Sequence, residues 1–312
     1  MTRRTRSRRI QRPRLASRIA ARLGAISWFR VGRVVFGLGV LTGLGAGWAY
    51  GLPALEQYVA RLPEYQRGLR VELVEIPAWL QANPHVVERI LEAAGVSSRD
   101  RRLDGSLARR VAGKVSANGW VERVNQVSIG ADDVVRVSCD YREPVAWVVH
   151  GSFYYLVDKA CVRLPGRYVR GEVTREGGLL LVAGVVEPPP PEGQTWSGVD
   201  VRVGVQMVGL LRDRPFYNQI VEVLVENHGG RRDRRRPHIE LTTDAGARIR
   251  WGRAPGEEID EPTAEQKLAH LQGLWREYRR VDMGRPWVDI QVWPDRVIVP
   301  ACSWQDNVRQ RS

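Results

Sequence analysis

Hydrophobic and polar residues alternate with recognisable periods along most of this chain. Between residues 69 and 141 the pattern runs from strand alternation through two helical faces to two further strands. One apolar helical face follows Asn83-Pro84 and ends at Gly95, and a second follows Asp104. The last two strands, 120–129 and 134–141, are joined by a Gly-Ala-Asp-Asp turn. This order predicts a small α+β layer with two helices on one face of a three-stranded sheet.

Strand patterns dominate the remainder of the chain, with helices expected at 200–211 and 263–280. The second helix opens with Thr263 and Gln266 in capping-box spacing. Further strands are expected at 153–157, 179–182, 220–225, 239–243 and 247–251, and a closing pair at 287–293 and 296–299 across Pro294-Asp295. The fold class is therefore α+β, with a mixed, β-rich second domain that contains two or three helices.

An uncharged stretch of 22 residues, Val34 to Leu55, precedes these patterns. A helix of that length is about 33 Å long, enough to cross the hydrocarbon core of a bilayer. Arginine-rich segments stay on the cytoplasmic side of membranes. The sequence thus predicts a single-pass transmembrane helix at 34–55, with a cytoplasmic N-terminus and the C-terminal domains across the membrane. Gly39, Gly43, Gly47 and Gly51 recur every four residues and predict a helix-packing groove within this span.

The expected division of the chain has six parts. A basic tail covers 1–33, and the transmembrane helix is followed by a stalk at 56–68. Pro53, near the end of the helix, and Pro63, within the stalk, mark the path of the chain away from the membrane. The α+β layer covers 69–146, the second domain 147–302, and a short tail 303–312.

The formal net charge of +13 suggests nucleic acid as a partner, but its distribution does not. Removing the eleven tail arginines from the 48 Lys+Arg leaves 37 basic against 35 acidic residues. We therefore expect anionic lipid at the basic tail and no nucleic acid. The arginines concerned are Arg3, Arg4, Arg6, Arg8, Arg9, Arg12, Arg14, Arg18, Arg22, Arg30 and Arg33.

Motifs for catalysis, cofactor binding and metal binding are missing from the sequence. The five histidines lack ligand spacing, and the acidic clusters at 132–133 and 257–261 fall in turns and loops. We therefore predict no enzyme activity, no catalytic residue, no metal, no cofactor and no small-molecule substrate. Cys139 fits the buried side of a strand; whether Cys139, Cys161 and Cys302 form a disulfide is left open.

One junction in the chain resembles a known family. The segment Tyr-Arg-Glu-Pro-Val-Ala-Trp at 141–147, followed by Tyr-Tyr-Leu-Val-Asp at 154–158, is similar to the link between the POTRA domain and the β-domain of FtsQ/DivIB division proteins. Residues 249–252, the helix from 263 and residues 288–292 resemble the closing pattern of that family. Cys161 stands where the family commonly has a turn glycine.

The resemblance implies a non-enzymatic, membrane-anchored scaffold of the bacterial division machinery. Such a scaffold links early and late septal proteins and septal peptidoglycan synthesis, at the inner membrane of the septum with its C-terminal domains in the periplasm. Implied partners are FtsB-like and FtsL-like small single-pass proteins and other division proteins. The implied docking edge consists of Val292, Trp293, Val297 and Val299, while Arg142, Glu143 and Pro144 form the interdomain junction. Pro144 lacks an N–H and therefore suits a strand break.

Two alternatives remain. An anchored envelope enzyme acting on cell-wall polymer would show a deep pocket with two facing carboxylates. A POTRA-bearing factor of outer-membrane assembly or secretion would carry repeated POTRA units and many amphipathic barrel strands. The insertions at Pro188–Pro191 and Arg231–Arg236 are expected to be solvated loops, and the oligomeric state is open.

Overall fold

The computed structural model describes residues 28–52, 55, 58, 68–97, 100–101, 104–173, 178–292 and 297–300. The chain divides into two compact units, Met1–Arg67 and Gly68–Ser312.

The first unit contains one long helix, α2 (Trp28–Ala46), which continues into a π-helical turn, η1 (Gly47–Gly51). α2 starts ahead of the predicted span and so includes Arg30 and Arg33, while its several glycines add little hydropathy. Among the helices of the described ranges, none combines the length and the apolar character that crossing a bilayer requires. The transmembrane helix predicted at 34–55, and the inner-membrane localisation and topology that rested on it, are therefore wrong.

The glycine groove predicted within that span is affected as well. Gly39 and Gly43 lie in α2, whereas Gly47 and Gly51 lie in η1, whose wider turn breaks the four-residue alignment. A Cβ placed on any of the four would meet no atom of the described structure within 4 Å. The membrane-packing role assigned to these glycines is withdrawn together with the span.

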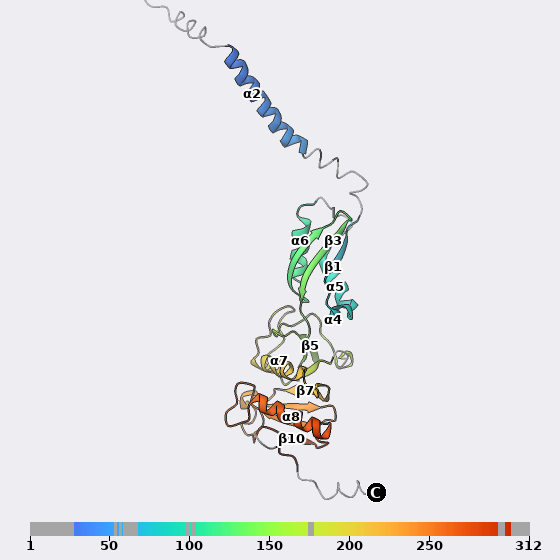
Figure 1. The fold of residues 1–312 in the computed structure, drawn as a ribbon, viewed down its shortest axis with the longest axis vertical. Helices are drawn as coiled ribbons and strands as arrows, with labels where there is room; N and C mark the ends of the chain where they lie inside the picture. Colours follow the sequence, from blue (N-terminus) through green and yellow to red (C-terminus); the bar gives the residue numbers. More distant parts are fainter. Residues whose placement is uncertain are drawn as a thin grey trace, which may run out of the picture. The chain divides into compact units, whose positions relative to one another are not determined.

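The second unit begins with the α+β layer that the sequence pattern predicts (Figure 1). Its sheet has the order β1-β3-β2, with β1 (Arg70–Val74) parallel to β3 (Val134–Tyr141) and β2 (Val121–Ile129) antiparallel to β3. Helices α5 (Pro84–Ala94) and α6 (Leu107–Ser116) pack on β1 and β2. A short helix that the pattern did not predict, α4 (Ala78–Gln81), precedes α5.

The ends of these helices differ in part from expectation. Pro84 occupies the first turn of α5, and Gly95 ends it with a left-handed φ of 58°. The Asn83 side chain does not cap the helix; its Nδ2 donates to the Trp79 carbonyl at 2.6 Å. The residue that precedes α6 is Ser106, and Asp104 instead accepts a hydrogen bond from the Ser106 amide at 2.9 Å.

The second sheet has seven strands in the order β10-β9-β8-β7-β6-β4-β5 and mixes parallel and antiparallel pairs. The helices α7 (Val199–Arg212) and α8 (Ala264–Tyr278) contribute to the core on one face of it. Thr263 caps α8 through the predicted capping box, with its Oγ1 accepting from the Gln266 amide. The strands are β4 (Ala146–His150), β5 (Phe153–Val157), β6 (Leu180–Ala183), β7 (Ile220–Leu224), β8 (Ile239–Thr243), β9 (Arg248–Gly252) and β10 (Trp287–Asp289), and short 3-10 turns lie at η3 (Arg170–Glu172), η4 (Tyr217–Gln219) and η5 (His228–Gly230).

Strands β4 and β5 are buried on both faces, which ties the two sheets together. Ala146 and Val148 belong to the core beneath α7 and α8, whereas Trp147 and Leu156 belong to the core of the three-stranded layer. Because successive side chains of a strand point to opposite faces, these two strands close both cores. Most helices and strands that the sequence predicts within 69–289 are thus observed, and the two strands that follow the junction contribute to both cores.

Candidate partner-binding site

The predicted junction residues connect β3 to β4. Arg142 lies just beyond β3, where its backbone amide donates to the Trp120 carbonyl at 2.9 Å. Its Nη1 atom forms an ion pair with Asp158 Oδ2 at 2.8 Å, and both side chains are largely buried. Because a buried charge requires a partner, this pair fixes the end of the first sheet to the hairpin that follows β5.

Asp158 also shapes the turn after β5. Its Oδ1 accepts hydrogen bonds from the backbone amides of Ala160 at 2.9 Å and Val162 at 2.8 Å. Cys161 takes a left-handed φ of 58° in this turn, at the position where glycine stands in the family that the sequence resembles. Its side chain is buried, and burial raises the pKa of the Cys161 thiol. The turn therefore keeps the glycine-type backbone with a cysteine in place.

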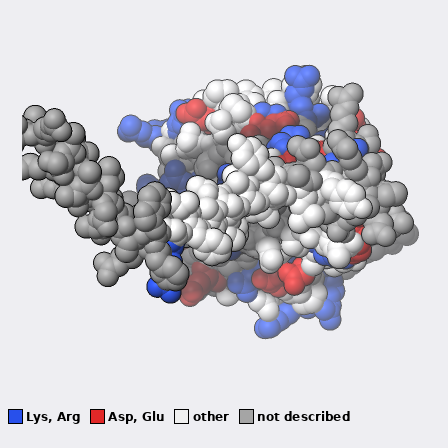
Figure 2. Space-filling model, turned by 90° about the horizontal axis from the view of Figure 1, so that it is seen from above, with Lys and Arg blue, Asp and Glu red and all other residues white. Residues whose placement is uncertain are grey.

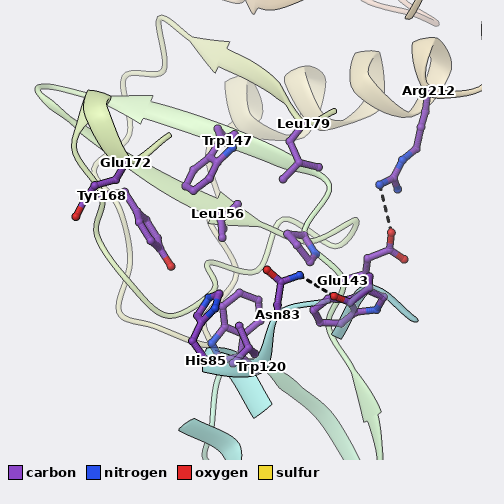
Figure 3. Close-up of a pocket in the computed structure, with 13 residues that line it drawn as sticks. Asn83, His85, Trp120, Glu143, Trp147, Leu156, Tyr168, Glu172, Leu179 and Arg212 are labelled. Atoms are coloured by element: carbon purple, nitrogen blue, oxygen red, sulfur yellow. Dashed lines mark hydrogen bonds and ion pairs between the residues drawn. The ribbon is translucent and has the colours of Figure 1, made fainter. Parts of the chain in front are cut away.

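Glu143 and Pro144 stand on the more exposed side of the junction. Glu143 Oε1 pairs with Arg212 Nη2, at the end of α7, over 3.2 Å. Together with Pro144 these two side chains line a pocket of about 270 Å³ (Figure 3). On one side of it lie Trp147, Leu156 and Tyr168; on the other lie Asn83, His85 and Trp120 of the three-stranded layer.

This pocket carries two carboxylates, Glu143 and Glu172, which Figure 3 places on different sides. Glu143 is paired with Arg212, and Glu172 Oε2 accepts from the Val169 backbone amide at 2.9 Å. Both carboxylates thus hold structural contacts.

The closing edge is shorter than the sequence predicts. β10 ends at Asp289, and it pairs in parallel with β9 at the margin of the seven-stranded sheet. Asp289 and Ile298 exchange two backbone hydrogen bonds, of 2.8 and 3.0 Å, so the returning segment adds an isolated bridge instead of the predicted strand at 296–299. The apolar alternation continues through buried Val288 and Ile290.

The four residues predicted to dock a partner occupy different environments. Val292 is 43% exposed, beyond the buried part of the closing segment. Val297 and Val299 are partly buried and pack against the core of the seven-stranded sheet. Trp293 lies outside the described residues. Of the predicted docking residues that the structure describes, Val292 is therefore the most exposed.

The arginine insertion is an exposed loop that two side chains anchor. Arg231 turns inward and pairs with the buried Asp200 at 2.7 Å. Asn227 holds the loop, since its Oδ1 accepts from the amides of Arg232 and Asp233, both at 2.9 Å. Asp200 is also 3.5 Å from His228 Nδ1. The insertion at 231–236 is exposed, as expected of a loop, but the sequence did not predict that Arg231 and Asn227 hold it in place.

Sequence reasoning missed two groupings that form only in three dimensions. His228 lies between Asp200 and Glu257, whose Oε2 is 3.3 Å from its Nε2. Trp79, Trp120 and Trp147 meet around one pocket from three distant segments. No local spacing connects such residues; the abundance of tryptophan, 11 in the chain, is the one available signal.

In the described portion of the chain, no three His, Cys, Asp or Glu side chains gather as metal ligands. Cys139 and Cys161 are free thiols there, and Cys302 lies outside it. Figure 2 shows basic and acidic side chains interspersed over the face in view. No protein-family model and no curated protein matches this chain.

Proposed function

We propose that the protein is a non-enzymatic scaffold of the bacterial division machinery, similar to FtsQ/DivIB, that holds small coiled-coil division proteins of the FtsB and FtsL type. Its order of a single POTRA-like layer followed by a β-domain supports this proposal. So does the ion-paired junction at Arg142, whose sequence carries the family resemblance.

The observation that carries the proposal is the position of β10 at the margin of the seven-stranded sheet. Edge strands present backbone N–H and C=O groups that a strand from another chain can complete. The segment at 297–300, bridged to β10 through Ile298, offers such groups, and Val292, beyond β10, has an exposed side chain. A partner strand added there would extend the sheet, and side chains such as Trp293 would anchor it.

The test is co-purification of an FtsB-like protein, co-expressed with an FtsL-like protein, on the tagged full-length chain. Val292→Lys places a charge on an exposed position and should reduce recovery of the partner severalfold while the fold is kept. Trp293→Asp combined with Val297→Lys should abolish it. Val199→Lys is the matched control, because Val199 is an equally exposed valine, on α7 (50% exposed).

Circular dichroism and thermal unfolding must show that each variant remains folded, which matters most for the partly buried Val297. Undiminished recovery with both the Val292 variant and the double variant would place the docking surface elsewhere. No recovery with the unaltered chain would reject the scaffold function itself.

A further inference from the structure

The pocket at the junction, called the junction pocket below, has an aromatic floor and a polar rim (Figure 3). The buried aromatic part of its lining, called the floor here, consists of Trp120 and Trp147, which lie on opposite sides of the pocket and are 2% and 7% exposed. Trp79 and Tyr168 form half-buried walls: Trp79 packs at 6.3 Å from Trp120, and Tyr168 meets Trp147 edge-on at 5.0 Å between ring centroids. Four aromatic rings thus converge on one cavity.

The floor contains donors without acceptors. The indole Nε1 atoms of Trp120 and Trp147 are buried and have no hydrogen-bond partner among the described residues. Indole donates and does not accept, and an unsatisfied buried donor costs about 1–3 kcal/mol. Native proteins seldom leave such groups unpaired. An occupant that brings carbonyl oxygens would therefore gain from both indoles, once the half-buried walls move enough to admit it.

Proline meets these requirements better than other residues do. It lacks a backbone N–H, so it buries no donor of its own against a floor that offers no acceptor. Its ring packs on aromatic faces, and its extended left-handed helix presents carbonyl groups outward at low entropic cost. The volume of about 270 Å³ lies just below the range for drug-sized ligands and suits one or two such rings.

The rim adds a preference for a basic neighbour. Arg212 pairs with Glu143 at 3.2 Å, whereas one carboxylate oxygen of Glu172 accepts a hydrogen bond from the Val169 backbone amide, and the carboxylate stands at the rim for a basic side chain to approach. We propose that the junction pocket binds a proline-rich segment of a partner protein, in the polyproline II conformation and flanked by a basic residue. This interface is separate from the closing edge and does not depend on the function proposed above.

A direct test uses a fluorescein-labelled peptide of ten prolines with an arginine at each end, titrated with the full-length chain by fluorescence anisotropy. A Gly-Ser peptide of the same length and charge is the reference. We expect the proline peptide to bind at least about tenfold more tightly. Trp79→Ala and Tyr168→Ala, each removing one wall, should weaken its binding by up to about tenfold, the size of one aromatic contact. Trp275→Ala removes a half-buried tryptophan of α8 and should change nothing.

A second readout follows the indole groups themselves. On addition of the proline peptide, the indole N–H resonances of Trp120 and Trp147, assigned through their Trp→Phe variants, should move downfield as they gain an acceptor. Those of Trp251 and Trp275 should stay in place. These shifts are read in the unaltered chain, so they do not depend on the stability of the two wall variants.

Three results would overturn the proposal. Equal affinity for the two peptides would mean that the flanking charges alone bind. Unchanged affinity in both wall variants, with unmoved indole resonances, would place binding elsewhere. The chain carries its own proline run at Pro188–Pro191. If the chain self-associates and loses this self-association with Pro189→Ser and Pro190→Ser, the occupant of the junction pocket is a second copy of the chain and not a partner protein.

Discussion

The two ends of the seven-stranded sheet are built in opposite ways. At the β4–β5 end both faces of the strands are buried, and the buried Arg142–Asp158 pair joins them to the first sheet. At the other end β10 is three residues long and is extended through a single bridge to Ile298. The difference teaches that the segment around Arg142 joins the two sheets, whereas the margin at which we propose that a partner strand docks lies at the opposite end.

The largest expected effect lies at the buried end. Asp158→Ala leaves the Arg142 guanidinium without its partner and frees two backbone amides, so we expect a loss of about 3–5 kcal/mol in the free energy of unfolding. Urea unfolding measures it. Asp140→Ala breaks an exposed pair with Arg123 and should cost at most about 1 kcal/mol. Equal costs for the two variants would remove the contrast between buried and exposed charges.

The region next to the closing edge has a buried carboxylate of its own. Burial alone would raise the pKa of Asp282, but hydrogen bonds from Arg280 at 2.6 Å, the Gly284 amide and Thr243 hold that pKa below its usual range. Asp282→Asn should cost about 1.5–3 kcal/mol at pH 7.

The pH dependence of that loss follows from the direction of the shift. A carboxyl whose pKa is lowered in the fold stabilises above its unfolded pKa of about 3.9, and this stabilisation fades as the pH falls through the folded value. Unfolding of the Asp282→Asn variant and the unaltered chain should therefore differ fully at pH 5–7 and converge below about pH 4. A difference that stays constant down to pH 3 would contradict the charged role of Asp282.

A smaller loss of stability is expected in the turn after β5. Replacing cysteine with valine, once in this turn and once in a strand, tests it. Cys161→Val puts a β-branched residue at a left-handed φ of 58° and should cost about 1–2 kcal/mol. Cys139→Val, in the extended strand β3, should change stability by less than about 1.5 kcal/mol. Cys161→Gly relieves the backbone but loses the buried thiol, so we expect little net change. Thermal unfolding measures these changes in stability. An unchanged stability of the Cys161→Val variant would mean that the backbone of the turn relaxes to accept valine.

The smallest effect is expected at the exposed side of the junction. Arg212→Ala removes the pair with Glu143, which is half exposed, and should cost less than about 1 kcal/mol, with a further reduction at high salt. Unfolding at 0.05 and 1 M NaCl measures both. A loss comparable to that of Asp158→Ala would show that this pair, too, holds the sheets together.

The sequence predicted elements well where periodicity and capping residues agree. Thr263 and Gln266 marked the start of α8, and Gly95 the end of α5, because capping is local chemistry. Prediction failed where the answer depends on context. The transmembrane prediction took the uncharged run at 34–55 as the helix, whereas α2 begins earlier and includes Arg30 and Arg33. The alternation at 287–293 predicted a longer strand, whereas β10 ends at Asp289. The junction pocket is formed by tryptophans on separate elements, and their spacing in the sequence does not predict that they meet.

The central claim, that a partner docks on the closing edge, is tested most directly by amide hydrogen exchange of the full-length chain with and without co-purified FtsB-like and FtsL-like proteins. A docked strand would protect the backbone amides of Val297 and Val299, which flank Ile298, whose own amide already donates to the Asp289 carbonyl. The amides of β2, at the edge of the other sheet, should exchange as before. Unchanged exchange at Val297 and Val299 in a complex that protects β2 or another surface would contradict the claim.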